Sequence, residues 1–492
     1  MRRGVLILGL TVLCLTEIQA QDFSRSQAHS ALDDFRKEAR ADFVNFRKRC
    51  MDDFLSFMRH PWKSFASEAP KSKPKKDAMP PQVAPEEDRI APADNTPVTI
   101  VGVVPPQPEV PQPKPALPIE EDRGTDRSMS FTFFGTAASV HFDAQRGPKL
   151  RGLDVNDIAT FLETLEKNGN DRLIHDCLQI RQTRRLSDWA YLQMLQAIGE
   201  TAYGKGTDEA ELLKAYIYCL SGYKMRIAHN DQWVKMLFAS RNVLFGLPSF
   251  TIDDDTYYCN DMIMGSMYVC EAPFPGEKQM SPGITECQQF DMRASEPRTI
   301  SSQQYPDMRV NSSVNRNLLD FYATYPTSYY GGDIMTRWAM FANTPMQEEV
   351  SRSLYPQLRQ LLSDRSELEQ VSRLLNLLQT GLEYEYDNRL WGGDRIFFSE
   401  ESLFYPYCDC EDRAILLTRL VRDLVGLTCI LIYYPGHLAC AVEFNEDVKG
   451  DCIQLDGHKF VVCDPTYIGA PVGNTMKGMD NATARVILLN SQ

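Results

Sequence analysis

Residues 408–426, CDCEDRAILLTRLVRDLVG, and residues 429–444, CILIYYPGHLACAVEF, decide the fold of the C-terminal third of the chain. Asp409 is a natural N-cap residue and Gly426 marks a helix end, so the first stretch predicts a helix with Cys410 in its first turn. The second stretch predicts two buried strands that turn at Pro435-Gly436. The predicted helix has one apolar face, formed by Ala414, Leu417, Leu420, Val421 and Leu424.

A further hairpin is expected after these strands, with Asp451 to Leu455 and His458 to Cys463 on either side of Asp456-Gly457. His437 opens one predicted strand, and Asp464 follows the end of another. If the strands are antiparallel, both side chains lie near one end of the sheet. We expect the helix N-terminus that carries Cys410 to pack against the same end.

Cys410, His437 and Asp464 are residue types that together perform nucleophilic catalysis. A thiol in the first turn of a helix feels the positive end of the helix dipole, which favours the thiolate. Glu411 and Asp412 oppose thiolate formation, so a histidine partner matters more here. A thiolate attacks a carbonyl, an imidazole protonates the leaving amine, and a carboxylate orients the imidazole.

Each of these residues also has a structural interpretation. Cys410 could be a core thiol, His437 a buried structural histidine, and Asp464 a turn residue before Pro465. Cys408 is an alternative nucleophile, although it precedes the predicted helix. His458 lies in a hairpin and is expected at the surface.

The chain resembles the transglutaminase-like superfamily in three pieces in order: residues 410–414 (CEDRA), 436–439 (GHLA) and 462–466 (VCDPT). The resemblance covers about residues 350 to 470. It implies a papain-like fold with Cys410 as nucleophile, His437 as base and Asp464 as the orienting acid. It also implies that Gln379 helps to bind the oxyanion, against the alternative of a structural or solvated glutamine. Cys408 stands where the superfamily usually has a small residue.

The N-terminal part of the chain has a different character. Residues 1–20 have the charged start, apolar centre and small final residue of a signal peptide. Within residues 21–67 an apolar stripe predicts an amphipathic helix that packs on a partner helix or on the main body, with self-association through residues 24–65 or membrane-surface binding as alternatives. Its stripe is Leu32, Phe35, Ala39, Phe43, Phe46, Cys50, Phe54 and Phe57. Residues 68–122 are proline-rich and predict a semi-rigid linker, in which Val98 to Val104 could add to a sheet.

The predicted fold class is α+β. Strands are expected in Met129 to Phe142, and about four helices in residues 153–245, within a mainly helical domain at 123–245. A β-rich region is expected at 246–345, and a transglutaminase-like catalytic domain at 346–492, which begins with helices from Gln347 to Thr380.

Composition limits the function further. The chain has 492 residues and a formal net charge of −14, which disfavours nucleic acid as a partner. The 13 cysteines show no zinc-type spacing, so most are expected to be buried core thiols, and neither a metal nor a cofactor is expected.

These features predict an exported protein of the periplasm, cell surface or surrounding medium. The expected activity is that of a peptidase or amidase acting through an acyl-thioester, on a peptide, protein or cell-envelope amide. The alternative is a catalytically silent domain that serves as a binding or assembly module.

Overall fold

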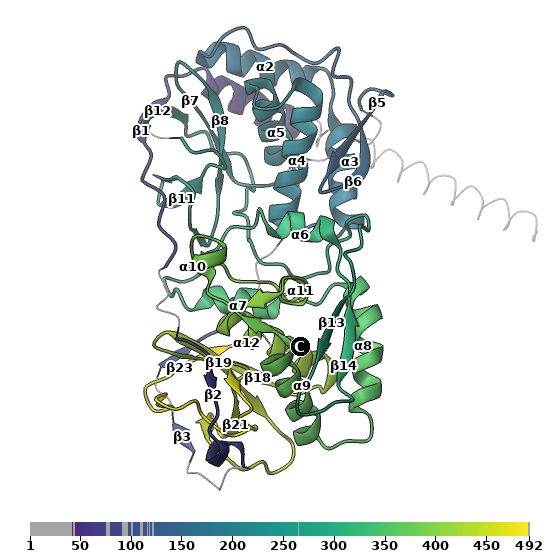
Figure 1. The fold of residues 1–492 in the computed structure, drawn as a ribbon. Coiled ribbons are helices and arrows are strands. Elements are labelled where there is room, and N and C mark those ends of the chain that lie inside the picture. Colours follow the sequence, from purple (N-terminus) through teal and green to yellow (C-terminus); the bar gives the residue numbers. More distant parts are fainter. Residues whose placement is uncertain are drawn as a thin grey trace, which may run out of the picture.

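The computed structural model describes residue 42 and residues 45–74, 79–90, 97–99, 102–108, 112–115, 117, 119–120, 123–263 and 265–490. The protein is α+β, as expected, and Figure 1 shows two lobes stacked one on the other. Residues 1–20, the predicted signal peptide, and most of the predicted stripe before Phe46 lie outside the described residues. Among the described residues, no helix is long and apolar enough to cross a membrane.

The N-terminal lobe combines helices with an antiparallel sheet in the order β1-β12-β7-β8-β11-β10. Asp154 caps α2 by accepting from the amides of Asn156 and Asp157. Helix α5 packs on β7 and β8. The helices are α2 (Val155–Lys167), α3 (Asp171–Thr183), α4 (Asp188–Tyr203) and α5 (Asp208–Leu220). The strands are β1 (Lys63–Ala66), β7 (Met225–His229), β8 (Val234–Ala239), β10 (Ser249–Ile252), β11 (Asp255–Tyr258) and β12 (Ser266–Cys270), with the hairpin β5 (Ser128–Phe133) and β6 (Thr136–His141) beside α3 and α4.

The four predicted helices are present, but the helical interpretation is wrong for residues 225–244. This stretch forms β7, β8 and β9 (Val243–Leu244). Its apolar runs are short and are interrupted at Asn230, and most of their residues are buried. Short buried strands and short pieces of helix give the same apolar pattern, so periodicity alone did not separate them.

Residues 45–58 form a helix that docks on the N-terminal lobe, which confirms the expected packing on the main body for this part. The predicted stripe is partly wrong, because Phe46 and Phe57 are exposed and Met51, Leu55 and Met58 are buried instead. Arg47 anchors the helix through ion pairs with Asp171 and Glu166. Self-association through residues 24–65 stays a prediction.

The segment between the lobes contains strands and helices, where a β-rich region was expected. Strands β10 to β12 belong to the N-terminal sheet, and β9 pairs with β15. Helices α6 and α7 were not predicted, because each spans only about two turns. The remaining elements are β13 (Arg298–Ser301), β14 (Arg309–Ser312), α6 (Arg316–Tyr322), β15 (Ser328–Tyr329) and α7 (Thr336–Asn343).

The C-terminal lobe holds a sheet in the order β3-β20-β21-β19-β18-β23-β4, with α12 packed on β18 and β19. The predicted helices at 347–380 and the predicted strands from Cys429 to Cys463 are all present. The helices are α8 (Glu348–Leu362), α9 (Glu367–Gly381), α10 (Asp387–Leu390), α11 (Ser399–Phe404) and α12 (Cys410–Leu424). The strands are β16 (Glu383–Tyr384), β17 (Tyr407–Cys408), β18 (Cys429–Tyr434), β19 (His437–Glu443), β20 (Cys452–Leu455), β21 (His458–Cys463), β22 (Tyr467–Ile468) and β23 (Arg485–Leu488).

Parts of the proline-rich stretch are built into this lobe. Strands β3 (Val98–Thr99) and β4 (Gly102–Val104) pair with β20 and β23, which confirms that the β-like run adds to a sheet. Strand β2 (Gln82–Val83) pairs with β22 and is followed by a short 3-10 helix, Glu86–Arg89. These described parts are therefore not a free linker.

Candidate active site

Helix α12 places Cys410 at its first position, as predicted. Asp409 precedes it as the N-cap, and the Asp409 amide donates to Asp412 Oδ2 at 3.1 Å. Asp412 Oδ1 accepts from the Phe397 amide at 2.8 Å, which holds the neighbouring loop against the helix start. Cys410 is completely buried.

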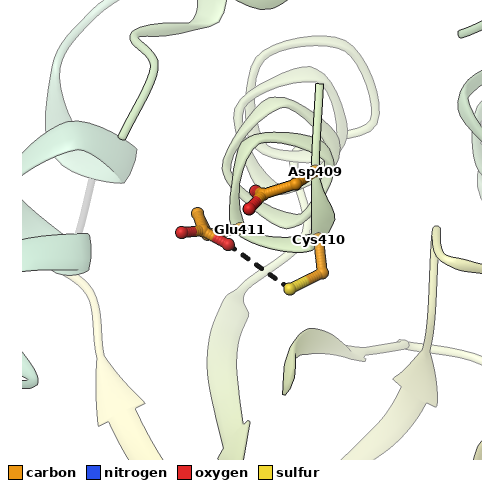
Figure 2. A group of neighbouring side chains, drawn as sticks. All are labelled: Asp409, Cys410 and Glu411. Carbon is orange, nitrogen blue, oxygen red and sulfur yellow. Dashed lines mark hydrogen bonds between the residues drawn. The ribbon is translucent and has the colours of Figure 1, made fainter. Parts of the chain in front are cut away.

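The thiol of Cys410 is directed at a carboxylate. Figure 2 shows the Cys410 and Glu411 side chains turned toward one another, with Sγ 3.3 Å from Glu411 Oε2. In this contact the thiol donates its hydrogen to the carboxylate oxygen. Glu411 therefore favours the thiol over the thiolate, as the sequence suggested.

His437 and Asp464 come together at one end of the C-terminal sheet. Strands β19 and β21 are antiparallel, with Cys440 opposite Cys463, so the start of β19 meets the end of β21. His437 Nε2 lies 2.8 Å from Asp464 Oδ2, and both side chains are buried. Asp464 Oδ1 accepts from the Thr466 amide at 2.8 Å and the Tyr467 amide at 3.3 Å. The Asp464 carboxylate therefore does two things: Oδ1 holds the turn that follows, and Oδ2 binds His437.

The electrostatics of His437 connect it to both other residues. Burial by itself lowers the pKa of His437, but the charge and hydrogen bond of Asp464, and then the neighbouring Cys410, raise it to about 10. The Asp464 contact occupies Nε2, and Nδ1 is buried and has no nitrogen or oxygen partner among the described residues. The arrangement stabilises an imidazolium with one nitrogen available to a thiolate.

Gln379 has a different role from the expected one. Its Nε2 donates to the carbonyls of Asp464 (3.1 Å), Tyr467 (2.8 Å) and Ala470 (3.0 Å), and its Oε1 accepts from the Gly469 amide (3.2 Å). Both amide hydrogens are committed to main-chain oxygens. Gln379 therefore fixes the loop that carries Asp464, and the expectation that it binds the oxyanion is corrected.

Two further residues that the sequence did not single out for a role shape the site. Arg413 is buried and donates to the carbonyls of Leu382 (2.8 Å), Pro465 (3.3 Å) and Gln379 (3.4 Å), so it joins α12 to the Asp464 loop. Tyr384 lies under the Arg413 guanidinium, and burial and then the nearby Cys410 raise the pKa of its hydroxyl. The sequence signal for the role of Arg413 was an arginine three residues after Cys410, within the predicted helix.

The alternative cysteine and histidine make other contacts. Cys408 lies in β17, its thiol is directed at the Glu383 carbonyl, and burial raises its pKa. His458 is exposed and contacts Glu443, as expected for a surface residue. Every cysteine from Cys50 to Cys463 is a free thiol, and most are buried.

Carboxylates cluster beside the thiol and border a cavity. Ligand-type atoms of Asp409, Cys410 and Glu411 lie within 4.8 Å of one another, as do those of Asp387, Asp394 and Glu411. The second set offers the oxygen atoms that hard cations prefer. However, Asp387 already accepts from the Arg395 amide at 2.8 Å, and Lys73 and Arg337 respond to the charge of Asp394. Asp394 and Trp391 line a cavity of about 400 Å³, together with residues of the 322–341 segment.

A scan against protein-family models gives no match to this chain, and a search of curated proteins finds no similar sequence. The function proposed below therefore rests on the residues and their geometry.

Proposed function

We propose that the protein is an exported, transglutaminase-like thiol hydrolase with a papain-like catalytic domain. It would cleave an amide bond of a peptide, protein or cell-envelope substrate through an acyl-thioester on Cys410. What supports this most is the His437–Asp464 contact together with the influence of Cys410 on the same histidine, with the three residues in the order Cys, His, Asp on separate elements. His437 is bound to Asp464 at 2.8 Å and lies close enough to Cys410 to respond to its charge.

The reacting form is the ion pair in which the Cys410 proton is already held on His437 Nδ1, so that Cys410 is a thiolate and His437 an imidazolium. The thiolate attacks the substrate carbonyl carbon, and the carbonyl electrons move onto oxygen. The main-chain amide of Cys410, at the first position of α12 and outside the Asp409–Asp412 capping box, is the proposed donor to this oxyanion. His437 then protonates the leaving amine, the C–N bond breaks, and an acyl-thioester remains on Cys410.

Water completes the cycle. His437, now neutral, accepts a proton from water as the hydroxide attacks the thioester. The thiolate leaves and recovers its imidazolium partner, and the acid product departs. Throughout, Asp464 holds the Nε2–H, and the Thr466 and Tyr467 amides hold Asp464.

Trapping of the acyl-enzyme tests this proposal. Incubation with a pool of activated peptide esters should add an acyl mass to Cys410 that alkaline hydroxylamine removes. Cys410→Ala and His437→Ala should abolish the adduct, while Cys408→Ala, the matched control, should retain it. An adduct that survives in Cys410→Ala, or none in any form, would refute the nucleophile assignment.

A second candidate function has one specific observation in its favour. Cys410 is fully buried and its thiol faces a carboxylate, which suits a silent binding module. In that case the three residues stabilise the fold, and Cys410→Ala leaves every binding property of the protein unchanged.

A further inference from the structure

The chain holds one of its own N-terminal residues between the two sides of the candidate site. The Met79 amide donates to the Gly436 carbonyl at 3.1 Å, and the Tyr384 hydroxyl donates to the Met79 carbonyl at 3.0 Å. Gly436 directly precedes His437. Tyr384 pairs with Cys408, two residues before Cys410. Both polar main-chain groups of Met79 are therefore bound next to the proposed catalytic pair, as a peptide strand would be.

The residues that follow Met79 run alongside the segment that follows Asp464. Gln82 and Val83 pair in parallel with Tyr467 and Ile468, which follow Asp464. The Ala84 amide donates to the Ile468 carbonyl at 2.9 Å. Asp88 then accepts from the Tyr467 hydroxyl, and its carbonyl accepts from Asn474. We call residues 79–90 the covering segment; Figure 1 places its strand β2 against the C-terminal lobe.

The covering segment has the chemistry of a bound peptide. Its first contacts use main-chain groups, and Pro80-Pro81 favours the extended conformation, which lowers the entropic cost of binding. Because the segment belongs to the same chain, its effective concentration at the site is of millimolar order. A free peptide would have to compete with it.

Burial of the catalytic pair agrees with this arrangement. The exposed fraction of Cys410 is 0% and that of His437 is 1%, so a carbonyl substrate has no access to the thiol in this conformation. Met79 lies where a substrate main chain would have to pass between Gly436 and Tyr384.

We propose that the strip formed by Gly436, Tyr384 and β22 is a groove for an extended polypeptide, and that the covering segment fills it as an internal inhibitor. The inference rests on the proposed function and specifies its substrate class as an extended peptide chain. A substrate would replace the main-chain contacts of Met79 and Ala84 with its own. Displacement or cleavage of the covering segment would activate the enzyme.

The test uses the full chain with the double substitution Met79→Pro and Ala84→Pro, which removes two of the amide donors. Glu86→Gln, in the same segment and exposed, is the matched control. Cys410 is alkylated with a tripeptidyl chloromethyl ketone, and the rate is read by mass spectrometry. Loss of two main-chain hydrogen bonds should raise the rate about tenfold, with no change in the control.

A binding measurement separates this inference from the catalytic proposal. A fluorescein-labelled peptide of residues 79–90 should bind the double variant, also carrying Cys410→Ala, and bind wild type at least tenfold more weakly. The unlabelled peptide should slow alkylation of the double variant again, which general unfolding could not explain. Absence of peptide binding, or equal alkylation in wild type and the double variant, overturns the groove. Peptide binding with an unreactive Cys410 keeps the groove and overturns the catalytic proposal.

Discussion

Replacement of Gln379 by leucine should destabilise the Asp464 loop rather than only slow a reaction. The Gln379 side chain bonds the carbonyls of Asp464, Tyr467 and Ala470 and the amide of Gly469. Leucine has a similar volume but offers none of these hydrogen bonds. The substitution therefore tests whether this buried amide is a structural clamp.

The magnitude follows from the partners that remain. The Asp464 carbonyl keeps the Tyr467 amide, and the Tyr467 carbonyl keeps the Ala470 amide. The Ala470 carbonyl and the Gly469 amide bear most of the loss. Each buried group left without a partner costs about 1–3 kcal/mol, so for two groups we expect a loss of about 2–6 kcal/mol.

Hydrogen exchange followed by mass spectrometry measures the local loss of stability, at the amides of Thr466, Tyr467 and Gly469. A urea melt measures the loss of global stability. Gln360→Leu, on the exposed face of α8, is the matched control and should change neither. A Gln379→Leu variant with native exchange and native stability, but a lower turnover, would refute this reasoning. It would return Gln379 to the oxyanion role.

Three other substitutions probe the charges of the molecule. Arg47→Ala should cost about 2–3 kcal/mol in a thermal melt, because Arg123 is then the one ion-pair partner of Asp171 and Glu166 among the described residues; native stability would contradict the docking of residues 45–58. Burial raises the pKa of Glu400 to about 7, so the folded state binds the extra proton and stability should fall as pH rises from about 4.5 to 7. Glu400→Gln should remove that fall and gain about 3 kcal/mol at pH 8; an unchanged pH profile of the urea midpoint would contradict this. Glu411→Gln should shift the pH profile of Cys410 alkylation about one pH unit lower, because a negative charge beside Sγ is lost. The control Glu443→Gln should leave the profile unshifted. An unshifted profile in Glu411→Gln would count against the Glu411 contact.

Sequence patterns predicted the C-terminal lobe well because its signals are local. Asp409 and Gly426 bound α12, and Asp456-Gly457 turns the β20–β21 hairpin with positive φ angles of 50° and 88°. Antiparallel pairing then brings His437 to Asp464 without further information. Such features depend on neighbouring residues, and a single sequence contains them.

The parts that failed depend on distant partners. Strands β7 and β8 look like helix in isolation and are fixed by pairing with each other and packing under α5. The role of Gln379 depends on carbonyls about 90 positions later, and that of Met79 on Gly436 and Tyr384. No spacing rule predicts main-chain contacts of this kind.

The rate of iodoacetamide labelling at Cys410, at pH 6, reports whether His437 activates the thiol. It should be measured in wild type and in the Met79→Pro/Ala84→Pro form, each with and without His437→Ala. An ordinary thiol with a pKa near ~8.5 reacts slowly at this pH. Labelling should be rapid in the Met79→Pro/Ala84→Pro form and should be lost when His437 is also replaced. Labelling of Cys410 that is slow in the uncovered form, or unaffected by His437→Ala, would contradict an activated Cys410–His437 pair.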